Sequence, residues 1–144
     1  MTAAFEHDWT CRFADADPFG IAHYPDIVVA IHDVSDRFMA EIGYSWATLA
    51  TEYDCGMPIV EVHVEFEAPI HADDTVTISL RPSLGERSAR FSYEGRFPNG
   101  TLAFTGHVQR AFVEKGADRA SPIPDWLREA FAPYLDDTGR DAGE

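Results

Sequence analysis

The chain has 144 residues, 45% of them hydrophobic, and a formal net charge of -14. This length allows one domain with a sizeable core, and the negative charge argues against binding nucleic acid through its phosphates. No apolar run approaches the roughly 20 residues of a membrane helix, and the N-terminus lacks a secretory pattern. The two cysteines have no metal-ligand spacing. We therefore expect a cytoplasmic protein without a metal or a membrane anchor.

The acidic residues are spread along the whole chain, and Lys115 is the only lysine. Such a surface repels itself at low salt, whereas molar salt shortens the screening length to about 3 Å. We therefore expect adaptation to a salt-filled, halophilic cytoplasm. The alternative is an ordinary acidic protein with an acidic tail.

Residues 5–13 alternate apolar and polar side chains, which predicts a half-buried strand. After a turn at Asp17–Gly20, Pro25 suits the first position of a helix. A wide apolar stripe then recurs at three- and four-residue steps up to Gly43, a plausible stop. Its members are Ile27, Val28, Ile31, Val34, Phe38, Met39 and Ile42. The stripe predicts a long helix that packs on a sheet.

Four further strands follow, in residues 60–67, 75–81, 88–97 and 102–114, and a short helix begins at Asp125 and ends near Tyr134. The short connections favour antiparallel neighbours in hairpin succession, with the helix across one face of a five-stranded sheet. Its other face is polar, so solvent or a second subunit could cover it. The fold class is α+β.

The segment from Asp15 to Pro25 places two carboxylates, a Pro/Gly turn and His-Tyr-Pro at the start of the predicted helix. A carboxylate there could attack a substrate or activate water. The unpaired N–H groups of the helix start could hold a developing oxyanion. This pattern indicates a catalytic site.

Residues 13–25, followed by a long helix, resemble the signature of the 4-hydroxybenzoyl-CoA thioesterase family, which are hotdog-fold acyl-CoA thioesterases. Residues 69–74 resemble the turn between the second and third strands of that family. The resemblance implies a hotdog fold, with a long central helix packed on a curved antiparallel five-stranded sheet. Residues 1–120 would form the hotdog domain, and residues 121–144 would add a short helix and an acidic tail.

The resemblance implies that Asp17 is the catalytic carboxylate, as nucleophile or general base, and that the backbone N–H of Tyr24 binds the thioester oxygen. Gly20, His23 and Pro25 would contribute to substrate binding. Coenzyme A would be part of the substrate, so no cofactor is expected. Arg87 and Arg90 would correspond to the arginine-rich patch that binds nucleotide phosphates in some members of that family. Asp26 and Ile27 depart from the usual Asn and aromatic residue, which leaves the acyl group undefined.

Several of these residues have a simpler interpretation. Asp17 could have no role beyond capping its turn. We expect Asp15 to accept hydrogen bonds from loop N–H groups. His23 could line the pocket or be an exposed hydrogen-bonding group, and the Tyr24 ring could pack against the helix. The acids Glu61, Glu65 and Glu67 are expected on a solvated strand face, and Cys55 is not expected to be a nucleophile.

The sequence therefore predicts an acyl-CoA thioesterase. A groove long enough for pantetheine would require a second subunit, so we expect a homodimer or a tetramer of dimers. Two alternatives stay open at this stage: a non-catalytic acyl-CoA-binding or regulatory module, and a hydratase of the hotdog superfamily.

Overall fold

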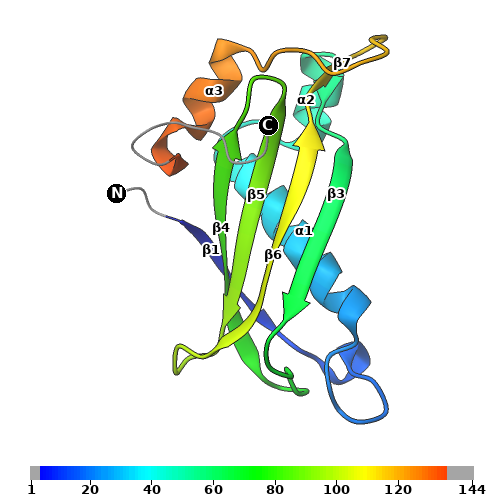
Figure 1. The fold of residues 1–144 in the computed structure, drawn as a ribbon, viewed down its shortest axis with the longest axis vertical. Coiled ribbons are helices and arrows are strands. Elements are labelled where there is room, and N and C mark those ends of the chain that lie inside the picture. The colour runs from blue at the N-terminus through cyan, green and yellow to red at the C-terminus, as the bar shows by residue number, and fades with distance from the viewer. Residues whose placement is uncertain (1–3, 136–144) are drawn as a thin grey trace.

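The structure is a computed structural model that describes residues 4–135. Its core is one antiparallel five-stranded sheet in the order β1-β4-β5-β6-β3, and the 18-residue helix α1 (Tyr24–Glu41) lies across one face of it (Figure 1). The strands are β1 (Phe5–Thr10), β3 (Ile59–Phe66), β4 (Thr75–Leu84), β5 (Ser88–Arg96) and β6 (Leu102–Ala111). Within the described residues, no helix is long and apolar enough to cross a membrane.

Smaller elements gather mainly at the end of the sheet where β6 finishes (Figure 1). They are α2 (Trp46–Glu52), the two-stranded sheet of β2 (Cys55–Gly56) and β7 (Val113–Glu114), and α3 (Asp125–Phe131). Two 3-10 turns cover Phe13–Asp15 and Ala132–Tyr134. The short C-terminal helix was predicted from the sequence, whereas α2 and the small sheet were not. The acidic tail lies outside the described residues.

The predicted apolar stripe is the buried side of α1. Ile27, Ile31, Val34 and Phe38 are at most 4% exposed. The Phe38 ring makes edge-to-face contacts with Phe5, Phe91, Phe131 and Tyr134, so α1, the sheet and the C-terminal segment share one core. The helix ends at Glu41, and Gly43 follows with φ 93°, a conformation that favours glycine.

Two details of the predicted sheet are wrong. The first strand ends at Thr10, because the chain then folds into the turn at Phe13–Asp15, and Phe13 is 88% exposed. The strands after the helix are not in hairpin succession throughout. β3 pairs with β6 rather than β4, because β1 and β5 occupy the two sides of β4.

β3 is an edge strand with unusual exposure of apolar side chains. Val60, Val62 and Phe66 are 64%, 47% and 50% exposed. The register with β6 shifts between Ile59 and Glu61, so Val60 forms a β-bulge. Within residues 4–135, β3 therefore presents both exposed apolar side chains and an edge of backbone groups that no other strand pairs with.

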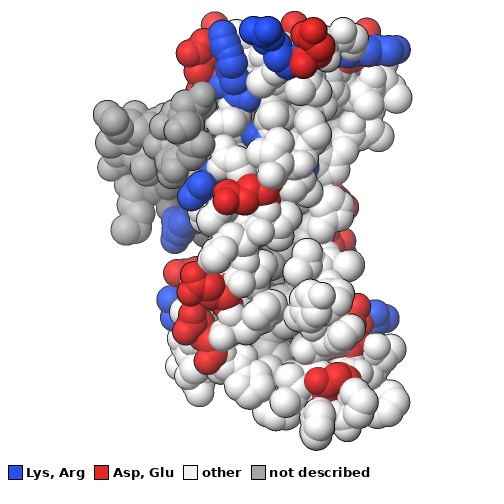
Figure 2. Space-filling view, turned by 45° about the vertical axis from the view of Figure 1, so that its right-hand side comes forward, with Lys and Arg blue, Asp and Glu red and all other residues white. Residues whose placement is uncertain are grey.

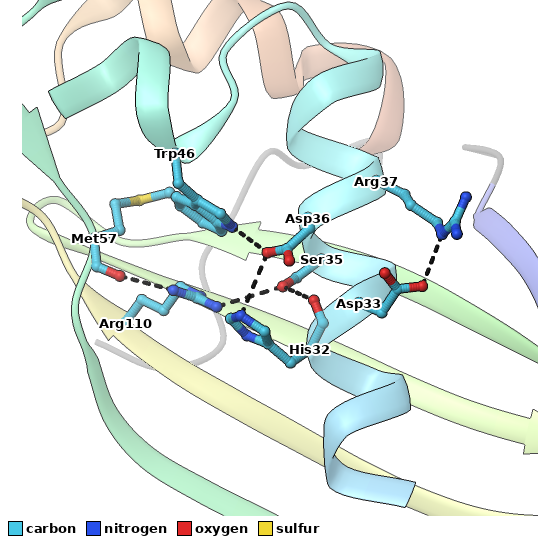
Figure 3. Close-up of polar contacts among 8 residues, drawn as sticks. All are labelled: His32, Asp33, Ser35, Asp36, Arg37, Trp46, Met57 and Arg110. Atoms are coloured by element: carbon cyan, nitrogen blue, oxygen red, sulfur yellow. Dashed lines mark hydrogen bonds and ion pairs between the residues drawn. The ribbon is translucent and has the colours of Figure 1, made fainter. Parts of the chain in front are cut away.

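A buried arginine joins α1, α2 and the sheet (Figure 3). Arg110, 5% exposed, donates hydrogen bonds from Nη1 to the Met57 carbonyl (2.8 Å) and from Nη2 to Ser35 Oγ (3.4 Å). Its guanidinium lies 4.3 Å from the Trp46 ring centroid, and Trp46 Nε1 donates to Asp36 Oδ1. These contacts connect Met57, just before β3, to α1 and α2.

Candidate active site

A tight turn at Asp17–Gly20 organises the loop before α1. The Gly20 N–H donates to the Asp17 carbonyl (2.9 Å), and Gly20 has φ +77°, which explains the glycine. Asp17 Oδ1 accepts hydrogen bonds from the N–H groups of Phe19 (2.8 Å) and Ile21 (3.1 Å). The turn-capping role of Asp17 is thus present. The second oxygen, Oδ2, forms no hydrogen bond with another described residue.

Asp15 has a structural role, as predicted. Its Oδ2 accepts hydrogen bonds from the backbone N–H of Arg12 (2.9 Å) and from Arg12 Nε (3.1 Å). The hydrogen bonds from the Arg12 side chain, and then from its N–H, lower the pKa of the Asp15 carboxyl. Asp15 therefore holds the loop as a buried carboxylate.

The start of α1 has an unpaired donor. The His23 N–H donates to the Asp15 carbonyl (2.7 Å), and His23 caps the helix without a side-chain hydrogen bond. Pro25, the second helical residue, has no N–H to offer. The N–H of Tyr24, the first helical residue, has no acceptor among the described residues. It therefore combines a free donor with the positive end of the helix dipole.

This helix start borders an apolar cavity of about 320 Å³. One wall is made by Ile21, Ala22, Tyr24 and Ile27, and the other by residues 66–70 at the end of β3. Backbone hydrogen bonds hold the two walls together, from Ala22 N–H to the Ile70 carbonyl (2.7 Å) and from Ala72 N–H to the Gly20 carbonyl (3.1 Å). The cavity is in the lower part of the range typical of small-molecule sites.

Of the site residues predicted from sequence, only Tyr24 lines this cavity. Asp17, Gly20, His23 and Pro25 lie in the same short segment but not in the cavity wall. The His23 ring contacts the Tyr24 ring edge to face, with centroids 5.6 Å apart. The predicted carboxylate and the helix start therefore share one short segment of sequence, and only the helix start borders the cavity.

Arg87 and Arg90 lie elsewhere in the chain, at the β4–β5 hairpin and the start of β5. That end of the sheet is opposite to the loop before α1 (Figure 1). Arg87 pairs with Glu86, and Arg90 donates to Gln109 Oε1 and lies 3.8 Å from Glu61. Figure 2 shows the largest group of Lys and Arg side chains at the upper end of the molecule. Within one chain, therefore, these arginines do not join the Asp17 loop.

Glu67 is a cavity residue that the sequence analysis did not name as part of the site. Glu67 is exposed like Glu61 and Glu65, as the strict alternation predicted, but β3 ends at Phe66 and Glu67 also lines the cavity. The N–H groups of Glu67 and Ala68 both donate to the Ala103 carbonyl, which ends the regular ladder. Pro69, two residues later, was the available signal that the strand had ended.

Other nucleophiles and metal sites are not evident in the described residues. Burial raises the pKa of the Cys55 thiol, and the nearby Glu114 and Asp54 act in the same direction. Among residues 4–135, no group of three His, Cys, Asp or Glu side chains could hold a metal ion.

Known proteins are similar to this chain in sequence and in fold. A 1,4-dihydroxy-2-naphthoyl-CoA hydrolase from Picosynechococcus is 28% identical over 94% of this chain and 98% of its own. A gentisyl-coenzyme A thioesterase structure is 27% identical with a TM-score of 0.75, covering 88% of this chain and 98% of that one. A Staphylococcus aureus protein, solved with CoA, has a TM-score of 0.86 at 18% identity, covering 100% and 90%.

The family comparison covers most of the domain. The profile described as the thioesterase-like superfamily matches residues 11–131, which include the Asp17 loop, α1 and all strands of the main sheet except β1. This chain belongs to the thioesterase-like superfamily.

Proposed function

We propose that this protein is an acyl-CoA thioesterase of the 4-hydroxybenzoyl-CoA type, in which α1 is the central helix of a hotdog fold. The observation that carries the proposal is the free Tyr24 N–H at the edge of an apolar cavity, next to the loop that carries Asp17. The relatives named as a 1,4-dihydroxy-2-naphthoyl-CoA hydrolase and a gentisyl-coenzyme A thioesterase support the same reaction.

In the proposed reaction, water and an acyl-CoA thioester give a free acid and the coenzyme A thiol. The Tyr24 N–H donates a hydrogen bond to the carbonyl oxygen as negative charge develops on it. Asp17 either attacks the carbonyl carbon or takes a proton from the attacking water. Its Oδ1 stays bound to the turn, which fixes the carboxylate, while Oδ2 is available to react.

The acyl group is proposed to be aromatic. The cavity walls are apolar apart from Tyr24 and Glu67, and the Tyr24 and Phe66 rings provide surfaces for stacking. Both thioesterase relatives are named for aromatic acyl groups, which favours the same class here. Coenzyme A is then bound as part of the substrate.

We further propose that the active enzyme is a homodimer or a tetramer of dimers. Phe66 lines the cavity from the end of the exposed strand β3, so a second copy that covers β3 would also enclose the site. In the same arrangement, Arg87 and Arg90 of one copy could contact the substrate bound at the site of the other copy, which they do not reach within one chain.

Replacing Asp17 tests the mechanism. Asp17→Asn keeps an oxygen that can accept the two turn hydrogen bonds, so the loop is expected to fold. Turnover measured by thiol release should fall by about 10²–10⁴-fold, the usual contribution of a general base. Asp33→Asn, an exposed substitution on α1, is the matched control and should retain activity.

Two outcomes would contradict the proposal. Undiminished thiol release by Asp17→Asn would remove Asp17 from the mechanism. No release by the wild type from a panel of aromatic and aliphatic acyl-CoAs would instead favour an acyl-CoA-binding module.

A further inference from the structure

Glu67 is the charged residue in the wall of the apolar cavity, and nothing in the proposed reaction uses it. We propose that Glu67 determines acyl specificity, its carboxylate accepting a hydrogen bond from a hydroxyl group on the acyl ring. This inference rests on the proposed function, because it assumes that the cavity holds the acyl part of the thioester.

The backbone fixes the position of Glu67. Phe66 is the last residue of β3 that pairs with β6, opposite Phe104. The next two N–H groups share one acceptor, the Ala103 carbonyl, at 2.8 Å from Glu67 and 3.1 Å from Ala68. This shared hydrogen bond departs from the ladder and lets residues 66–70 wrap around the cavity. Backbone hydrogen bonds therefore hold Glu67 at the end of β3.

The carboxylate of Glu67 has no hydrogen bond or ion pair with another described residue. The other two acids of this strand segment differ: Glu61 Oε1 lies 3.0 Å from His107 Nε2, and Glu65 Oε2 lies 2.8 Å from His63 Nε2. Glu67 is exposed to solvent at the cavity wall, so its oxygens are available to a ligand there.

The chemistry of a carboxylate defines the group that it would bind. An ionised carboxylate only accepts hydrogen bonds, so it favours a donor such as a ring hydroxyl and repels an acyl group that carries its own carboxylate. The Tyr24 hydroxyl can both donate and accept, so it does not make this distinction. The apolar residues Ile21, Ile27 and Ile70 would pack against the ring itself.

The test compares substrates within each variant. The ratio of kcat/KM for 3- or 4-hydroxybenzoyl-CoA to kcat/KM for benzoyl-CoA is measured for wild type, Glu67→Gln and Glu67→Met. Loss of a hydrogen bond to a charged group should lower this ratio by about tenfold in Glu67→Met. Gln keeps one acceptor oxygen without the charge, so its ratio should lie between the other two. Glu65→Gln, two residues away, is the control and should keep the wild-type ratio.

Each result separates this inference from the proposed function. A lower ratio in both Glu67 variants supports it. An equal loss of kcat/KM on both substrates would make Glu67 a catalytic or structural residue and would overturn the inference. Unchanged kcat/KM values on both substrates would overturn it as well. Wild-type thiol release without preference for the hydroxylated substrates refutes only the inference. No release from any thioester refutes the proposed function and the inference with it.

Discussion

The two edges of the main sheet differ sharply in what they expose. β1 has six residues, its apolar side chains face the core, and Glu6, Asp8 and Thr10 point outward. β3 has eight residues and leaves Val60, Val62 and Phe66 about half exposed or more. Charges on an edge prevent pairing with another chain, whereas an apolar, unprotected edge favours it. The exposed apolar side chains of β3, which also carries Glu61 and Glu65, support the proposal that a second copy covers β3 rather than β1.

A charge in the middle of β3 is expected to have the largest effect. Val62→Lys would bury an unpaired cation in the proposed dimer, so its dissociation constant should rise about 100-fold or more. Glu6→Lys on β1 is the control and should leave assembly unchanged. Sedimentation equilibrium measures both. A wild-type protein that is monomeric while active would contradict the role assigned to β3.

Phenylalanines on the two edge strands offer a matched pair. Phe5 of β1 packs edge to face on the buried Phe38, so Phe5→Ala should lower the free energy of unfolding by about 3 kcal/mol. Phe66 of β3 lines the cavity and is half exposed in a single chain. Phe66→Ala should mainly lower kcat/KM, by about tenfold. Denaturant unfolding measures the loss of stability, and thiol release measures the loss of kcat/KM. A mainly catalytic effect of Phe5→Ala and a mainly destabilising effect of Phe66→Ala would contradict the roles assigned to the two strands.

The loop that follows β1 should show a smaller, pH-dependent effect. Hydrogen bonds from Arg12 lower the pKa of Asp15, so its stabilisation is complete above the usual Asp pKa and is lost as the pH falls through the lowered value. Asp15→Asn should therefore cost about 1 kcal/mol at neutral pH and almost nothing in strong acid. Urea unfolding across pH measures this. A cost that is independent of pH would exclude the charge as its cause.

Salt should raise the stability of the fold slightly. With 25 acidic and 11 basic residues, screening by molar KCl reduces repulsion over the surface, including the acids of β1. The melting temperature should rise by a few degrees, about what 1 kcal/mol produces in a domain of this size. A melting temperature that does not increase would refute the halophilic hypothesis.

Local patterns predicted most of the architecture, because α1 and the strands bury one face each. Ile27, Ile31, Val34 and Phe38 are buried as their spacing indicated. The pairing of β3 with β6 was not predictable in this way, because alternation describes the faces of a strand and not its neighbours. Arg110 was also missed, since a lone arginine in a strand gives no sign of its burial against Trp46 and Ser35.

The candidate site was partly predictable for the same reason. The Asp17 turn and the start of α1 are local in sequence, and both are present. The second wall of the cavity comes from residues 66–70, more than forty positions away, and depends on where β3 stops. The hydrogen bonds from the N–H groups of Glu67 and Ala68 to the Ala103 carbonyl leave no periodic signal, so the cavity position of Glu67 was not predicted, although its exposure was.

The bulge at Val60 limits how two copies could meet. A newly added strand would find a regular ladder only along residues 61–66, because the extra residue interrupts the pattern before Glu61. Antiparallel self-pairing over that window would put the two-fold axis close to His63 and Val64. In the proposed dimer, the extra residue at Val60 would therefore determine where the two-fold axis lies.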